Sequence, residues 1–230
     1  MSEDGLGTVI ISGGASGLGA AIAYAVAAAG GVPVVFDVRA SRNGFEQHTV
    51  DVSDRTATEA AVGMVVERHH GVDAVVTSAA IDACGPFDDV DAESWERVLR
   101  VNLLGTVSMV RAALPHLIQS QGRVVTVGST LGLRGAAGAT AYCASKFGII
   151  GFTRALAADT AGRVGVTCLI PGGMATSFFD GREPKYQPAP EQQLNRPEDV
   201  AQAALFALRQ PRGCEVRELL IMPSLETSWP

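Results

Sequence analysis

Thr8-Val-Ile-Ile-Ser12 is a short β-branched run, and it leads directly into the turn Gly13-Gly-Ala-Ser-Gly-Leu-Gly19 and the alanine-rich stretch Ala20-Ala-Ile-Ala-Tyr-Ala-Val-Ala-Ala-Ala29. This order is typical of a strand, a glycine-rich loop and a helix. The glycines allow close backbone approach, and the helix N-terminus offers free N–H groups and a partial positive charge to a phosphate. The stretch therefore predicts a dinucleotide site, although the same glycines would also suit a plain tight crossing from strand to helix.

Strands and helices alternate along the rest of the chain. Strands are predicted at 8–12, 32–37, 47–51, 73–77, 123–128, 164–170 and 217–222, and helices at 17–29, 54–69, 92–119, 140–161 and 197–209. This alternation builds a parallel sheet wrapped by helices on both faces. We therefore expect an α/β fold, a Rossmann-like doubly wound sheet of about seven strands. It would form a single domain over residues 1–230, with a substrate loop at about 173–195.

The connection between the second and third strands is short. The stretch Val38-Arg-Ala-Ser-Arg-Asn-Gly-Phe-Glu-Gln47 spans this gap, whereas a complete crossover takes at least about 10–12 residues for the connection alone. We predict a loop or a single turn in place of a crossover helix, which leaves that side of the sheet less covered.

Composition and charge restrict the class of protein. The 230 residues are 47% hydrophobic, enough for one substantial core, and the net charge of −6 argues against nucleic acid or an anionic membrane as the main partner. The sequence has no secretory-signal pattern and no uninterrupted apolar run of about 18 residues. Its four cysteines are widely spaced and its four histidines lack ligand spacing, so we expect a cytoplasmic protein with free thiols and no metal.

Tyr142-Cys-Ala-Ser-Lys146 places a phenol and an ammonium four residues apart, on one face of a predicted helix. A free tyrosine has a pKa of ~10, and a neighbouring cation moves it toward the neutral range needed for proton transfer. Ser129 ends the apolar run that starts at Arg123, so its hydroxyl is expected at the sheet edge where open α/β sheets bind ligands. The Tyr/Lys pair is a weak pattern alone and gains its weight from the glycine turn.

In this order and spacing, Gly13-x-x-x-Gly17-x-Gly19, Asn102, Ser129, Tyr142 and Lys146 resemble the short-chain dehydrogenase/reductase family. The resemblance covers about Thr8 to Met222. Its further matches are Asp51-Val52, Pro171-Gly172-x-x-x-Thr176 and Arg196-Pro-Glu-Asp-Val-Ala201.

The resemblance implies an oxidoreductase that interconverts a secondary alcohol and a ketone. Tyr142 would exchange a proton with the substrate oxygen, and Lys146 would bind the nicotinamide ribose and lower the pKa of Tyr142. Ser129 would hold the reacting oxygen, and Asn102 would support a water-linked proton path from Lys146. The partners implied are a small-molecule alcohol or ketone and further copies of the chain, in a homodimer or homotetramer.

Cofactor contacts also follow from the resemblance. They are Gly13, Ser16, Gly17, Leu18, Gly19, Asp37, Asp51, Val52, Ala79, Tyr142, Lys146, Pro171, Gly172 and Thr176. Asp37 closes the second strand about twenty residues beyond the glycine turn, where a carboxylate accepts hydrogen bonds from the adenosine ribose and repels a 2′-phosphate. We therefore expect NAD rather than NADP, with the nearby Arg39 as the residue that favours NADP.

The sequence departs from the family pattern in three places. Thr77-Ser78-Ala79-Ala80 replaces Asn-Asn-Ala-Gly after the fourth strand, the glycine turn opens with Ser12 rather than threonine, and the chain end, which includes Trp229, lacks the usual glycine pair. The pocket walls are expected from 82–87, 131–140 and 174–192, with Arg134, Arg182 and Lys185 either as anion contacts or, for the arginines, as solvated loop residues. Two other functions stay open: an NADPH-dependent ketoreductase of the 3-oxoacyl type, and a non-catalytic dinucleotide sensor.

Overall fold

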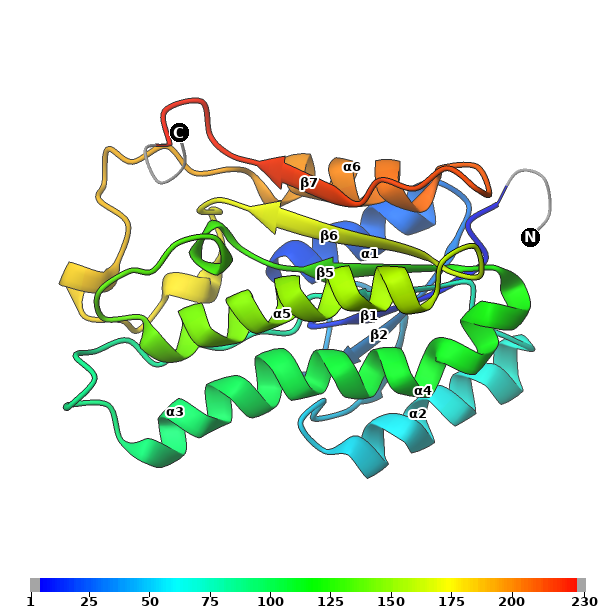
Figure 1. The fold of residues 1–230 in the computed structure, drawn as a ribbon, viewed down its shortest axis with the longest axis horizontal. Coiled ribbons are helices and arrows are strands. Elements are labelled where there is room, and N and C mark those ends of the chain that lie inside the picture. Colours follow the sequence, from blue (N-terminus) through cyan, green and yellow to red (C-terminus); the bar gives the residue numbers. More distant parts are fainter. Residues whose placement is uncertain (1–4, 227–230) are drawn as a thin grey trace.

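One seven-stranded parallel sheet forms the centre of the molecule in the computed structural model, which describes residues 5–226 (Figure 1). The strands are β1 (Thr8–Ser12), β2 (Val32–Asp37), β3 (Glu46–Thr49), β4 (Ala74–Thr77), β5 (Arg123–Val127), β6 (Gly165–Pro171) and β7 (Glu218–Ile221). Their order is β3-β2-β1-β4-β5-β6-β7, and every neighbouring pair is parallel. The order reverses between β1 and β4, the point where doubly wound sheets bind ligands, so the predicted fold class is confirmed.

Helices cover both faces of this sheet. They are α1 (Gly17–Ala28), α2 (Arg55–His69), α3 (Ala92–Leu99), α4 (Gly105–Ser120), α5 (Thr140–Asp159) and α6 (Pro197–Leu208). Neighbouring residues of β1 enter different cores. Ile10 packs with Met109 and Leu117 of α4, whereas Ile11 packs with residues of α1 and α6 such as Val26. Burial on both faces explains why the strands are continuously apolar in the sequence.

The predicted absence of a crossover helix between β2 and β3 is confirmed, because residues 38–45 form a loop. Element ends agree with the sequence predictions within two residues, but β3 ends at Thr49 rather than at Asp51. The chain leaves the sheet there because Val50 and Val52 turn into the core that contains residues of α2, and a turn follows with Asp54 N donating to Asp51 O at 2.9 Å.

The helix predicted at 92–119 is interrupted. A π-helical turn, η1 (Arg100–Leu104), separates α3 from α4 and contains Asn102. By length and composition the segment Ala92–Ser120 is the one candidate membrane span among the described residues, and 44% of its apolar window is buried within the protein. Trp229 lies outside the described residues.

Candidate active site

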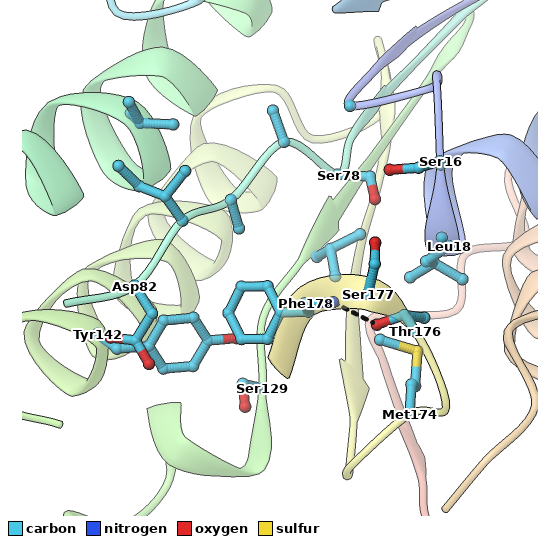
Figure 2. Close-up of a pocket in the computed structure, with 18 of the residues that line it drawn as sticks. Ser16, Leu18, Ser78, Asp82, Ser129, Tyr142, Met174, Thr176, Ser177 and Phe178 are labelled. Carbon is cyan, nitrogen blue, oxygen red and sulfur yellow. Dashed lines mark hydrogen bonds between the residues drawn. The ribbon is translucent and has the colours of Figure 1, made fainter. Parts of the chain in front are cut away.

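A cleft of about 840 Å³ opens at the carboxyl ends of the strands. Its lining includes every predicted site residue except Asn102, namely Gly13, Ser16, Gly17, Leu18, Gly19, Asp37, Asp51, Val52, Ala79, Ser129, Tyr142, Lys146, Pro171, Gly172 and Thr176. Figure 2 shows Ser16 and Leu18 toward one end of this cleft and Ser129 and Tyr142 toward the other. Residues 5–226 contain no group of three or more His, Cys, Asp or Glu placed to hold a metal ion.

The glycine turn is shaped so that side chains would block it. Gly13 has φ +69°, and a Cβ atom there would lie 2.8 Å from the Cα of Ala79, while a Cβ at Gly19 would collide with the carbonyl oxygen of Gly13. Ser16 is the N-cap of α1, and within the described chain its side chain makes no capping hydrogen bond to the first-turn N–H groups. These N–H groups and the helix dipole therefore face the cleft as an anion cradle, which fits the pyrophosphate of a dinucleotide.

The hydroxyl of Ser12 braces β1 against the loop that follows β4. Its Oγ accepts hydrogen bonds from Ser78 N at 3.1 Å and Ala79 N at 3.2 Å. Thr77, which stands where the family has asparagine, is buried, and its Oγ1 has no hydrogen-bond partner among the described residues. The bracing therefore comes from the neighbouring strand rather than from the altered Thr77–Ala80 stretch.

The adenosine end of the cleft holds Asp37 and Arg39 together. Asp37 is 7% exposed; its Oδ2 accepts from Ala15 N at 3.0 Å, and its Oδ1 accepts from Arg39 N at 2.9 Å. The Arg39 guanidinium donates to Ser16 Oγ at 2.6 Å and so reaches over the glycine turn. A carboxylate and a cation thus face the same part of the cleft.

Asp51 lies near the same end, on the turn after β3. Its Oδ1 accepts from Ser53 N at 3.0 Å and from Ser53 Oγ at 2.7 Å, and Arg97 lies 3.9 Å from its Oδ2. Burial alone would raise the pKa of Asp51, but the two Ser53 hydrogen bonds and the Arg97 charge together hold that pKa below its ordinary value. The adjacent Val52 is buried beside it at 5% exposure.

Ser129, Tyr142 and Lys146 converge at the other end. Burial raises the pKa of Tyr142, and a hydrogen bond with Ser129 opposes that rise. Lys146 is 2% exposed, and its Nζ donates to the carbonyl of Val127 at 2.8 Å and lies 5.4 Å from the centre of the Tyr142 ring. Burial lowers the pKa of Lys146 to about 8.

The role of Lys146 in lowering the pKa of Tyr142 stays a prediction. Loss of water around the phenol raises that pKa more than the Ser129 hydrogen bond and the Arg182 charge lower it. The physical reason is burial, which depends on side chains from several distant segments.

Asn102 lies behind the cleft wall rather than on it. Its side chain is fully buried, its Oδ1 accepts from Ile81 N at 2.8 Å, and its Nδ2 donates to Ile81 O at 2.9 Å and Ser145 Oγ at 3.1 Å. These bonds tie the π turn and the loop after β4 to α5, the helix of Tyr142. Its role in a water-linked proton path stays a prediction.

The substrate end contains a pair that sequence reasoning missed. Asp82 and Arg182 form an ion pair of 3.2 Å, with side chains 6% and 14% exposed. Arg182 was expected to contact an external anion, but its anionic partner here is within the chain. Arg134 and Lys185, expected in the same role, do not line the cleft. The pair joins positions one hundred residues apart, so no local pattern in the sequence signals it.

The fold and this cleft define a class of nucleotide-dependent oxidoreductase that acts on alcohol or carbonyl groups. Residues 7–187 match the family described as short chain dehydrogenase, and the chain belongs to that family. Members of the family act on CH–OH or carbonyl groups with NAD(P).

Individual relatives cover nearly the whole chain. L-fucose dehydrogenase of Mus musculus is 31% identical over 242 residues, 96% of this chain and 89% of the relative. The 3-oxoacyl-acyl-carrier-protein reductase FabG of Thermotoga maritima is 30% identical over 216 residues, 86% of this chain and 88% of the relative. A solved short chain dehydrogenase from Burkholderia cenocepacia, in complex with NADP, is 28% identical with a TM-score of 0.85, covering 96% of this chain and 98% of that one.

Proposed function

We propose that this chain is an NAD(H)-dependent oxidoreductase that interconverts a secondary alcohol and a ketone of small or medium size. The observation that carries the proposal is the convergence of Ser129, Tyr142 and Lys146 on the cleft that also contains the glycine turn. A bound NAD supplies the site with a hydride acceptor, and NADH with a hydride donor, at the nicotinamide ring.

Each of the three side chains has a chemical role. Tyr142, whose buried phenol keeps its proton, gives that proton to the substrate oxygen during ketone reduction, and its phenolate form receives the proton of the hydroxyl during alcohol oxidation. Ser129 hydrogen-bonds the same oxygen and holds it beside the phenol. Lys146, with a pKa of about 8, stays charged in most molecules at pH 7 and anchors the ribose next to the nicotinamide.

The preference for NAD(H) rests on Asp37. Its buried carboxylate stands at the end of β2 and lines the cleft, where it would accept hydrogen bonds from both adenosine ribose hydroxyls and repel a 2′-phosphate. Arg39, 2.6 Å from Ser16 Oγ, acts in the opposite sense because a guanidinium binds phosphate well. We infer that Asp37 dominates, since the Arg39 side chain is 65% exposed and its charge is therefore screened by water.

The test is a titration of the protein with NADH and with NADPH, followed by cofactor fluorescence. We expect at least about tenfold tighter binding of NADH, equivalent to ~1.4 kcal/mol. Asp37→Ala should reduce this ratio, and Arg39→Ala should raise it. Tighter binding of NADPH by the unaltered protein would overturn the NAD assignment and favour the ketoreductase of the 3-oxoacyl type.

We also propose a homodimer or homotetramer. Leu104 of η1 and Phe147 of α5 are large apolar side chains that are 53% and 47% exposed, on neighbouring elements, so a second copy would remove apolar surface from water. Light scattering coupled to size-exclusion chromatography tests this, and a monomer at micromolar concentration would contradict it. Location in the cytoplasm stays a prediction.

A further inference from the structure

The ion pair between Asp82 and Arg182 lies at the substrate end of the cleft. Asp82 lies on the loop after β4, and Arg182 follows the short helix η3 (Ser177–Phe179) after β6. The guanidinium lies over the rings of Phe178 and Phe179, 4.5 Å and 4.8 Å from their centres. Two loops that are distant in sequence thus meet at a charged contact beside two aromatic rings.

Joining two loops through a buried ion pair carries a desolvation cost. Both charges lose most of their water, and a buried ion pair is often no more stabilising than apolar side chains of similar size. The pair is also imperfectly aligned, because the buried Arg182 Nη2 atom lies 3.2 Å from Asp82 Oδ2 but makes no well-aligned hydrogen bond to it or to any other atom of the described chain. On the other side, Asp82 accepts from Ala83 N at 2.8 Å and from the weak donor Cys84 Sγ at 3.1 Å. A carboxylate has about four acceptor positions, so capacity remains.

The pair also lies beside the proposed reacting group. Asp82 and Arg182 line the same cleft as Tyr142. The Phe178 ring contacts the Arg182 guanidinium, and its centre lies 5.5 Å from that of the Tyr142 ring. Figure 2 shows Asp82 next to Tyr142, with Phe178 alongside. The electrostatic influence of both charges on the pKa of Tyr142 agrees with this closeness.

We propose that Asp82 and Arg182 recognise a second hydroxyl group on the substrate, next to the carbon that reacts. The substrate class is then a neutral vicinal diol, or the corresponding α-hydroxy ketone, and this inference rests on the proposed function. The second hydroxyl donates to the Asp82 carboxylate and accepts from the Arg182 guanidinium. Phe178 and Phe179 contact the carbon skeleton.

The charges of the pair also indicate which substrate groups the site disfavours. Because Asp82 and Arg182 neutralise each other, a carboxylate or an ammonium in the place of the second hydroxyl would be repelled by one partner and attracted by the other, and it would lose its water without a net gain in charge pairing. A substrate with only one hydroxyl would make no hydrogen bond to Asp82 and Arg182, whose side chains are largely shielded from water. Sites built to bond a hydroxyl reject analogues that lack it for this reason.

The first experiment measures binding without turnover. The Tyr142→Phe variant is saturated with NAD, and trans-1,2-cyclohexanediol and cyclohexanol are titrated in separately by calorimetry. We expect the diol to bind at least about tenfold more tightly, the strength of a hydrogen bond to a charged group. Equal affinity for the two alcohols would overturn the proposal.

The second experiment assigns this preference to the pair. Asp82→Asn and Arg182→Met should reduce the ratio of kcat/KM for diol over cyclohexanol toward one, at least about fivefold below that of the unaltered enzyme. Disturbed loop packing would lower both values together and leave the ratio unchanged, and that result would overturn the assignment. Asp88→Asn is the matched control, because Asp88 is an exposed carboxylate of the same loop that does not line the cleft.

The remaining outcomes separate this inference from the function on which it rests. Tighter binding of trans-2-hydroxycyclohexanecarboxylate than of the diol would overturn the neutral substrate class and make Arg182 a carboxylate site. Preferential binding of the diol, with no turnover of any secondary alcohol by the unaltered enzyme and either cofactor, would support recognition by the pair and overturn the proposed reaction.

Discussion

The two ends of the cleft are built by different means. At the cofactor end the backbone makes the surface, because Gly13 and Gly19 hold the turn close to its neighbours and a Cβ atom on either would collide. At the substrate end side chains make the surface, with Asp82 and Arg182 paired across two loops. Backbone geometry fixed by strand order suits a ligand portion that is always the same. Side chains on loops can be exchanged without disturbing the sheet, which suits a substrate that differs among relatives.

Tyr142→Phe tests most strongly whether the two ends are separable. Removing the phenolic oxygen should lower kcat by about 10²- to 10⁴-fold, the usual contribution of a general acid, while NADH affinity changes less than about threefold. Turnover with a secondary alcohol and fluorescence titration with NADH measure the two effects. Tyr24→Phe is the control, since Tyr24 is exposed on α1. Undiminished turnover would reject Tyr142 as the proton donor.

Gly13→Ala should disrupt cofactor binding without altering the substrate end of the cleft. The added Cβ would lie 2.8 Å from the backbone of Ala79, and the alanine would have to adopt the positive φ that Gly13 has. We therefore expect about tenfold or greater loss of NADH affinity and about 1–3 kcal/mol lower stability. Gly30→Ala is a matched control, because Gly30 also has a positive φ but would meet no atom within 4 Å. Gly30→Ala should lower the stability of the protein without weakening NADH binding. Similar NADH affinity in the two variants would contradict the collision at Gly13.

The sequence predicts the cofactor end better than the substrate end, for a physical reason. The glycines of the turn lie within seven residues of each other, and Tyr142 lies four residues before Lys146, so the periodicity of strands and helices places the members of each motif together. The Asp82–Arg182 pair joins two loops, whose conformations follow from packing rather than from periodicity. The π turn at Asn102 differs from a regular helix by one hydrogen-bond step and has no sequence pattern of its own. The raised pKa of Tyr142 depends on burial by segments from the whole chain.

The loop that replaces the usual crossover helix gives a finer test of the cofactor end. Asn43 Nδ2 donates to the Gly14 carbonyl at 3.1 Å, so this loop braces the glycine turn from outside. Asn43→Ala should weaken NADH binding about two- to tenfold, equivalent to 0.5–1.5 kcal/mol, without changing the ratio of kcat/KM for two alcohols. Arg42→Ala, at an exposed position of the same loop, is the control. A changed alcohol ratio would show that the two ends are coupled.

The smallest expected effect lies at β3, beyond the cofactor end. Glu46 accepts from His69 Nε2 at 2.9 Å, contacts His48 Nε2 at 3.1 Å and lies 3.1 Å from Arg68 Nε, which ties the edge strand to α2. Burial alone would raise the pKa of Glu46, but the two histidines and Arg68 hold that pKa below its ordinary value of 4.5. The ionised carboxylate is therefore favoured in the folded state, and this stabilisation is present above pH 4.5 and lost as the pH falls through the lowered folded-state pKa.

Glu46→Gln should therefore lower the free energy of unfolding by about 1 kcal/mol at pH 7, and the difference from the unaltered protein should shrink as the pH falls below about 4.5. Urea unfolding at a series of pH values measures it. Glu59→Gln removes an exposed carboxylate paired with Arg55 on α2 and should cost less than about 0.5 kcal/mol at pH 7. A Glu46→Gln difference that stays constant with pH would mean that the lost contribution is packing rather than charge. Because β3 lies beyond the cleft, NADH affinity should be unchanged, and this separates the stability of the sheet edge from the backbone geometry that forms the cofactor end.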